Sequence, residues 1–144
     1  DIHVAAEETE IVTVLGSCVA VCLYDTLRAI GGMNHYLLPL WKDHDLKTPR
    51  YGDISIENLI ENMLSKGSNI STIEAKIFGG AQMHEVTHEH MMVGKKNIMI
   101  ANAVLDKYNI PIVAQDVGGI NGRRISMQSH TGKVKMRYTQ RSDL

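Results

Sequence analysis

Short apolar segments rich in β-branched residues, separated by glycine or polar turns, dominate the first part of the chain. The segment from Ile11 to Leu15 and the segment from Cys18 to Tyr24 are both rich in valine, and Gly16-Ser17 interrupts them. A third segment runs from Ala29 to Leu38, after a turn over Asp25 to Arg28, and ends at a proline. Such composition favours strands over helices, so we predict three strands here, with the last two joined as a hairpin.

Two later segments repeat their apolar residues at helical spacing. The first follows a polar loop over residues 40–53, with Asp53 or Ser55 as its N-terminal cap, and Gly67 is suited to end it. The second covers roughly residues 95–108. Their predicted inner faces consist of Ile56, Leu59, Ile60, Met63 and Leu64 in the first helix, and of Ile98, Ala101, Val104, Leu105 and Tyr108 in the second.

The second half of the chain adds further strands. We predict them over Thr72 to Phe78, over Ile110 to Gln115, and in a hairpin that pairs Arg124 to Ser129 with Lys133 to Tyr138 around a Thr131-Gly132 turn. The element order is then ββ(β)αβαβββ. We therefore expect an α+β fold, in which a mixed, largely antiparallel sheet or two packed sheets carry about two main helices. The length fits a single domain over residues 1–144.

Composition excludes several functional classes. The formal net charge is −1 and the charged fraction is 22%, which argues against a nucleic-acid-binding surface. No apolar run approaches the roughly 18 residues of a membrane span, so we expect no membrane insertion. Cys18 and Cys22 would lie about 13 Å apart on one strand, too far for a disulfide. Free thiols are typical of a reducing compartment, which favours the cytoplasm.

Cys18 and His35 are the candidate catalytic pair. If Thr26-Leu27 is the centre of the hairpin, the two residues lie directly opposite each other, with Cβ atoms roughly 4.5–5.5 Å apart. An imidazolium at that distance would lower the pKa of the thiol and make a nucleophilic thiolate. The structural alternative is that Cys18 is a small core residue, as we expect for Cys22.

The segments around this pair resemble the CheD family of chemoreceptor glutamine deamidases. The resemblance runs from about residue 11 to residue 137 and rests on Thr13 to Asp25, Gly31 to Pro39, Glu74 to Gly80, Gly94 to Asn97, Asp116 to Gly119 and Gly122 to Arg124. It implies cysteine-dependent hydrolysis of glutamine side chains on chemotaxis receptors, with release of ammonia, and hydrolysis of receptor glutamyl methyl esters in some members.

The resemblance also implies roles for individual residues. The catalytic cysteine of the family matches Cys18 and its histidine matches His35. A third catalytic residue, a threonine shortly before the cysteine, matches Thr13 most naturally, although Ser17 is another nearby hydroxyl and Thr13 could be an ordinary strand residue. The turn from Gly16 through Ser17 to Cys18 is the candidate source of N–H groups that stabilise an oxyanion and let the substrate approach.

Partners and fold follow from the same resemblance. It implies that no metal or cofactor is needed, that the substrate is a long helical receptor segment, and that the phosphatase CheC is a partner. One alternative function is therefore a binding module that regulates CheC, with minor catalysis. Another is a thiol redox sensor built on Cys18. The resemblance further implies a fold similar to the catalytic domain of the toxin deamidase cytotoxic necrotizing factor.

Three other patterns carry weaker signals. His84, His88 and His90 could bind zinc, because the first two have the spacing of helical ligands, but a solvated polar loop is the alternative that we favour. Gly79-Gly80 and Gly118-Gly119 lack the spacing of a nucleotide loop and are expected to form tight turns. Arg123-Arg124 is interpreted as surface charge in preference to a contact with an acidic receptor or partner surface.

Overall fold

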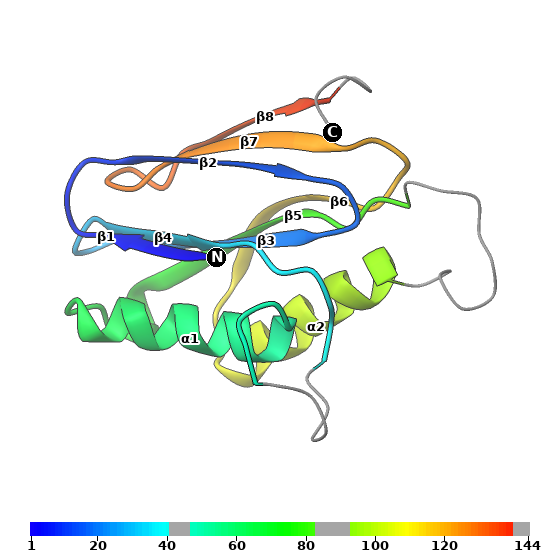
Figure 1. The fold of residues 1–144 in the computed structure, drawn as a ribbon. Coiled ribbons are helices and arrows are strands. Elements are labelled where there is room, and N and C mark those ends of the chain that lie inside the picture. Colours follow the sequence, from blue (N-terminus) through cyan, green and yellow to red (C-terminus); the bar gives the residue numbers. More distant parts are fainter. Residues whose placement is uncertain (41–46, 83–92, 140–144) are drawn as a thin grey trace.

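The computed structural model describes residues 1–40, 47–82 and 93–139 (Figure 1). No helix among them is both long enough and apolar enough to cross a membrane. In chain order these residues form the strands and helices β1 (Ile2–Ala5), β2 (Glu10–Leu15), β3 (Val19–Asp25), β4 (Ile30–Asn34), α1 (Gly52–Ser65), a 3-10 turn (Ile70–Thr72), β5 (Ile73–Gly79), α2 (Val93–Lys107), β6 (Ile112–Val117), β7 (Arg123–Gln128) and β8 (Val134–Tyr138).

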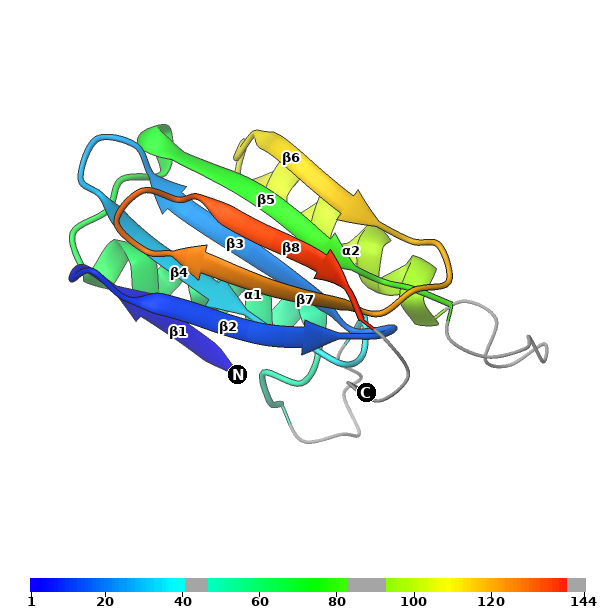
Figure 2. The same cartoon turned by 90° about the horizontal axis from the view of Figure 1, so that it is seen from above.

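The strands form two sheets in a three-layered structure. The larger sheet has five strands in the order β1-β4-β3-β5-β6, and the smaller has three in the order β2-β7-β8. Only β5 and β6 pair in parallel. Both helices lie against one face of the five-stranded sheet, and the three-stranded sheet covers the other face (Figures 1 and 2). The expected α+β class, with largely antiparallel sheets and two main helices, is confirmed.

The central strand β3 contributes to two cores. Val19, Val21 and Leu23 pack in the core between the five-stranded sheet and the helices. Ala20 and Cys22 belong to a second core between the two sheets, and Cys22 is buried as expected. Because both faces of β3 are covered, apolar residues occupy nearly every position and the alternation typical of a half-exposed strand is weak.

The helical faces follow the sequence pattern with two exceptions. The expected inner residues of α1 are buried, except for Leu64, which is exposed. In α2 the sequence pattern omitted Asn97, which is fully buried. Ala101, Val104 and Leu105 are buried as expected, and Ile98 and Tyr108 are partly buried against the same core.

The two ends of α1 are stabilised differently. Tyr51 is the N-terminal cap, so the expectation of Asp53 or Ser55 is wrong. The first N–H groups of the helix donate to the carbonyls of Leu38 and Pro39, which replaces the usual side-chain cap. At the other end the chain turns at Gly67, whose φ of 104° confirms its expected role as the stop.

Strands β3 and β4 form the expected hairpin, but in a different register. The turn spans residues 26–29, and a last bridge pairs Val19 with Tyr36. The prediction that Cys18 lies directly opposite His35 is therefore wrong. In the observed register Ala20 lies opposite His35, and Cys18 is one diagonal step away on the same face of the sheet.

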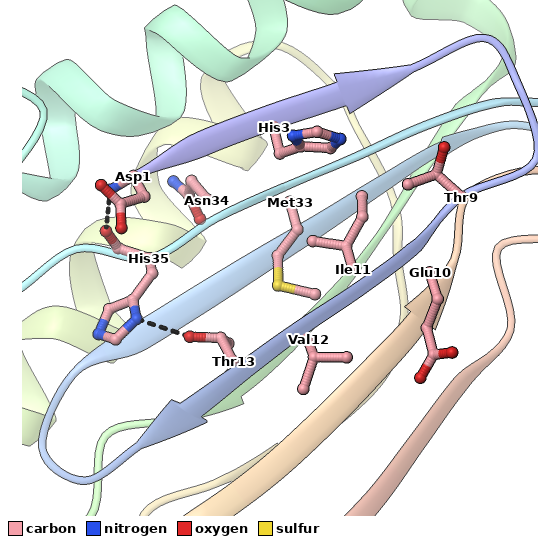
Figure 3. A pocket seen from close by; sticks show the side chains of 10 residues that line it. All are labelled: Asp1, His3, Thr9, Glu10, Ile11, Val12, Thr13, Met33, Asn34 and His35. Atoms are coloured by element: carbon pink, nitrogen blue, oxygen red, sulfur yellow. Dashed lines mark hydrogen bonds between the residues drawn. The ribbon is translucent and has the colours of Figure 1, made fainter.

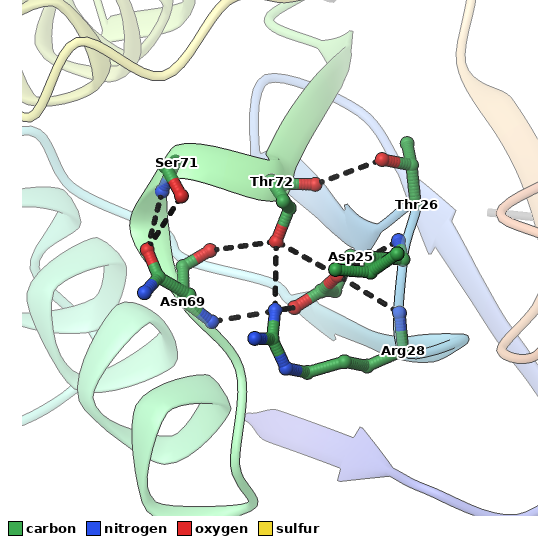
Figure 4. Close-up of polar contacts among 7 residues, drawn as sticks. Asp25, Thr26, Arg28, Asn69, Ser71 and Thr72 are labelled. Carbon is green, nitrogen blue, oxygen red and sulfur yellow. Dashed lines mark hydrogen bonds and ion pairs between the residues drawn. The ribbon is translucent and has the colours of Figure 1, made fainter.

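The carboxylate of Asp25 holds the hairpin turn in place (Figure 4). It accepts hydrogen bonds from the backbone N–H groups of Leu27 and Arg28, each at 3.0 Å, and from the hydroxyl of Thr72 at 2.9 Å. Burial alone would raise the pKa of Asp25, but the hydrogen bonds from Thr72, Arg28 and Leu27 hold that pKa well below its usual range. The register of the hairpin is thus fixed at the end opposite Cys18 and His35.

The interpretation of Arg123 as surface charge is wrong. Its side chain is only 3% exposed, and it pairs with Asp116 at 2.8 Å. The same guanidinium donates to the carbonyls of Gly118 and Gly79, at 2.8 Å and 3.4 Å. Along β7 buried and half-buried residues alternate, so Arg123 faces inward while Arg124 faces outward.

Candidate active site

Cys18 and His35 face the space between the two sheets. Cys18 packs against the same core as Ala20 and Cys22. On β4, Met33 belongs to that core as well, and His35 follows it at the strand period of two residues. Both candidate residues therefore lie on the face of the five-stranded sheet that β2 covers.

Thr13 of β2 contacts His35 across this space. Its Oγ1 lies 2.8 Å from Nδ1 of His35, and Figure 3 shows the two side chains pointing toward each other from opposite sheets. The hydroxyl can donate to a bare Nδ1 or accept from Nδ1–H. In either case the contact fixes the ring and leaves Nε2 as the nitrogen that can exchange a proton with a thiol.

The backbone of His35 is held by a strand that the sequence analysis missed. Asp1 and His35 exchange two backbone hydrogen bonds, of 3.0 Å and 2.9 Å, in continuation of the pairing between β1 and β4. The alternation of Ile2 and Val4 is the signal of this strand, and four residues are too short a run to identify from periodicity alone.

Burial determines the protonation of the pair. It raises the pKa of the Cys18 thiol and lowers the pKa of His35. Both shifts oppose the thiolate–imidazolium pair that the sequence analysis expects, and that pair stays a prediction. These directions favour a thiol and a neutral imidazole, which is the state in which a histidine can accept the proton of a nucleophile.

The second ring nitrogen of His35 has no partner in the structure as described. Nε2 is buried and has no hydrogen-bond partner within the described parts of the chain. An unsatisfied buried nitrogen costs free energy, and catalytic hydrogen bonds commonly form only when substrate is bound. A shift of the diagonal neighbour Cys18 or the arrival of a water or substrate group would satisfy it.

The turn Gly16-Ser17-Cys18 connects β2 of one sheet to β3 of the other, and all three of its carbonyl groups accept hydrogen bonds. Gly16 O accepts from Ala81 N at 3.0 Å and Cys18 O from Gly80 N at 2.8 Å. Ser17 O accepts from Nδ2 of Asn97 at 3.0 Å. Among the described residues the backbone N–H groups of Ser17 and Cys18 donate to no other backbone carbonyl. They remain the candidate donors for a developing oxyanion, as the sequence analysis expects.

Glycine is needed at position 79 because the backbone there passes close to the carbonyl oxygen of Cys18. Gly79 has a φ of 106°, and a Cβ atom there would overlap the carbonyl oxygen of Cys18. Gly80, Gly118 and Gly119 also have positive φ, which confirms the expected tight turns. Gly118 N donates to Gly79 O at 2.9 Å, so the two glycine pairs support each other beneath the Cys18 turn.

A hollow of about 280 Å³ leads to the Thr13–His35 contact from the open edges of the sheets (Figure 3). Its walls include His3, Glu10, Met33 and Asn34. His35 also lines a second hollow with Leu37 and Arg50. His35 thus lines both hollows.

Of the five residues that the sequence analysis selected, the structure brings Thr13 into contact with His35. It places Cys18, preceded by Gly16 and Ser17, one diagonal step from His35 on the same face of the sheet. It adds Asn97, which the sequence analysis used only as part of a matching segment. The possible zinc ligands His84, His88 and His90 lie outside the described residues. Within the described parts of the chain no cluster of His, Cys, Asp and Glu side chains could hold a metal ion.

The site contains a thiol, an imidazole and a hydroxyl that contacts it, which are the groups of a candidate cysteine-dependent hydrolase. The family model for CheD, chemotactic sensory transduction, matches residues 37–138. A probable chemoreceptor glutamine deamidase CheD from Sulfurimonas denitrificans is 48% identical over 99% of this chain and 92% of its own length. Proteins of the same name from Trichlorobacter lovleyi and Thermococcus kodakarensis are 48% and 42% identical, over 92% and 94% of this chain and 82% and 87% of their own lengths. The chain belongs to the CheD family.

Proposed function

We propose that this protein hydrolyses glutamine side chains of chemotaxis receptors to glutamate, with Cys18 as nucleophile and His35 as general base and acid. The observation that carries the proposal is the Thr13–His35 contact of 2.8 Å on the face of the sheet where Cys18 lies. The names of the relatives, chemoreceptor glutamine deamidase, supply the substrate class.

The first half of the proposed reaction forms a thioester. Nε2 of His35 takes the thiol proton as the sulfur of Cys18 attacks the carboxamide carbon. The carbonyl oxygen becomes an oxyanion, which the N–H groups of Ser17 and Cys18 stabilise. The imidazolium then donates its proton to the amide nitrogen, the C–N bond breaks, and ammonia leaves.

The second half restores the enzyme. Neutral His35 takes a proton from water as the water oxygen attacks the thioester carbon. The C–S bond breaks, the imidazolium returns the proton to the sulfur, and the product is a glutamate side chain. Thr13 orients the ring of His35 throughout, as the third member of a triad does. The proposal includes hydrolysis of receptor glutamyl methyl esters. Such an ester presents the same acyl carbon, so methanol leaves in place of ammonia.

The proposal also includes the setting of the reaction. The receptor substrate is a helical cytoplasmic segment, which places this protein in the cytoplasm. The phosphatase CheC is the proposed protein partner, on the basis of the family resemblance alone.

Ammonia release and mass spectrometry of a receptor fragment test the proposal. We expect the wild type to convert selected glutamines to glutamates and the Cys18→Ala and His35→Ala variants to lose this activity. Cys22→Ala is the matched control, because Cys22 is a buried thiol of the same strand face. Wild-type rates in Cys18→Ala would contradict the mechanism. An inactive wild type that binds CheC would favour the regulatory module, and reversible oxidation of Cys18 without ammonia release would favour the redox sensor.

A further inference from the structure

Asn97 lies in the first half of α2 and is fully buried. Its side-chain nitrogen Nδ2 donates to Ser17 O at 3.0 Å and to Leu37 O at 3.1 Å. Ser17 directly precedes Cys18, and Leu37 follows His35 by two positions. One amide group therefore connects the segment that carries the nucleophile to the segment that carries the base.

A third hydrogen bond strengthens this connection. The hydroxyl of Tyr36, which is also fully buried, donates to the backbone carbonyl of Asn97. Tyr36 is the residue next to His35. Through Asn97, α2 is thus bonded to a direct sequence neighbour of each of the two candidate catalytic residues.

The position of Asn97 matters because the sheet ladder ends just before the site. Val19 and Tyr36 exchange the last pair of backbone hydrogen bonds between these two segments, at 3.2 Å and 3.0 Å. Ser17, Cys18 and Leu37 lie beyond that pair, where no ladder holds the segments together. Nδ2 of Asn97 replaces the missing ladder with two hydrogen bonds from a single buried atom. The two donated bonds also determine which end of the amide is the nitrogen.

We propose that Asn97 is a positioning residue that sets the distance between Cys18 and His35. The inference rests on the proposed function, because it assigns these two residues as nucleophile and base. Productive attack requires the reacting groups to be held closely, and a misplacement of about 1 Å can lower a rate by about 100-fold. Asn97 contacts neither the thiol nor the imidazole, so it acts through the backbone of their neighbours.

The test compares Asn97→Ala and Asn97→Asp with the wild type. Asparagine and aspartate have nearly the same shape, but a carboxylate in place of the amide would meet two carbonyl oxygens with no proton to donate. We expect kcat for receptor deamidation to fall by about 10- to 100-fold, with KM within about two-fold of the wild type. Tyr36→Phe removes only the third hydrogen bond and should lower kcat by about five-fold.

The alkylation of Cys18 by iodoacetamide provides a second measurement that does not depend on deamidation. In the wild type the alkylation rate should rise with increasing pH as His35 loses its proton. This rise in rate should be absent in His35→Ala. We expect Asn97→Ala to lack the same pH-dependent rise in alkylation rate. If the wild type releases no ammonia, the proposed function fails. If that wild type still shows the pH-dependent rise in alkylation, the comparison with Asn97→Ala still tests the positioning role of Asn97.

Val104→Ala is the matched control for general loosening of α2. Val104 is buried in the same helix, so its truncation should lower the melting temperature without changing kcat or the alkylation profile of the folded protein. A folded Asn97→Ala with wild-type kcat and profile would overturn the inference. A Val104→Ala variant that loses kcat and the alkylation profile to the same degree as Asn97→Ala would also overturn the inference. If neither Asn97 variant folds, wild-type kcat in folded Tyr36→Phe overturns it.

Discussion

Oγ1 of Thr13 lies 2.8 Å from Nδ1 of His35, although the two residues belong to different sheets. This contact crosses the core between the sheets at the open edge of β2 (Figure 3). It occupies the nitrogen of His35 that a third catalytic group normally holds and leaves Nε2 without a partner among the described residues. The geometry therefore supports Thr13, rather than Ser17, as the residue that orients the base.

Removing the Thr13 hydroxyl should lower kcat while leaving the strand intact. Valine has the same branched shape and favours strands equally well, so Thr13→Val deletes the hydrogen bond alone. A bond of about 1 kcal/mol corresponds to about a five-fold loss, and release of the ring from its orientation should bring the total to about 10-fold or more. Steady-state ammonia release measures the effect.

Two variants control this prediction. Thr13→Ser keeps the hydroxyl and should retain most of the activity. Thr9→Val makes the same substitution in the same hollow, but the hydroxyl of Thr9 donates to Glu7 O rather than to His35, so its kcat should not change. Equal losses in Thr13→Val and Thr9→Val would indicate that the hollow, and not the His35 contact, is what matters.

The sequence pattern predicts that the candidate residues Cys18 and His35 share one face of the sheet, but it does not predict the register of the hairpin. Strand period alone places Cys18 and His35 on one face, and a shift of two residues preserves that relation. The exact pairing depends on the turn, which Asp25 holds through Thr72, a residue distant in sequence. No local pattern contains that contact, so the expected direct opposition of Cys18 and His35 failed while their shared face was correct.

The sequence pattern also does not predict the contacts between the layers of the structure. The Thr13–His35 bond forms only when the two sheets pack with β2 over β4. The contacts of Asn97 and Arg123 form only when α2 and the glycine turns pack near the turn that contains Cys18. A polar residue on a helix or an arginine pair ordinarily lies at the surface. Asn97 and Arg123 lie in the matching family segments, but the match alone does not indicate that they are buried.

The pH dependence of activity should reflect the neutral resting pair. Burial lowers the pKa of His35, so kcat/KM should fall only below about pH 6.5, as protonation of His35 removes the base. Burial raises the pKa of Cys18, so no loss should occur up to about pH 8.5. A thiolate–imidazolium pair would instead lose activity as pH rises through the pKa of the imidazolium. An alkaline decline between about pH 7 and 8.5 would contradict the neutral pair.

Alanine at position 79 should damage the site more than alanine at position 118. Both glycines have positive φ, of 106° and 79°, so each substitution carries a backbone strain of about 1–2 kcal/mol. A Cβ at position 118 meets open space, whereas one at position 79 overlaps Cys18 O. We expect Gly118→Ala to lower stability alone and Gly79→Ala to lower stability and kcat together. Urea unfolding and ammonia release separate the two effects, and equal kcat values would refute a link between Gly79 and the nucleophile turn.

Arg123 and Arg124 should differ sharply in their contributions to stability. Arg123 is buried and bonded to Asp116, Gly118 O and Gly79 O. Arg123→Met retains the apolar stem but removes the charged partner of Asp116 and the donor to Gly118 O, although Gly118 N still donates to Gly79 O. The free energy of unfolding should therefore fall by about 2–4 kcal/mol.

Its neighbour Arg124 is half-buried on the outward side of the same strand, and Arg124→Met should change the free energy of unfolding by less than about 0.5 kcal/mol. Urea denaturation at pH 7 measures both variants. Because Gly79 and Gly80 adjoin the Cys18 turn, Arg123→Met should also lower kcat in the folded protein, whereas Arg124→Met should not. Similar stabilities for the two variants would mean that the buried guanidinium does not support the glycine turns. A destabilised but fully active Arg123→Met would instead separate the stability of those turns from the position of the nucleophile.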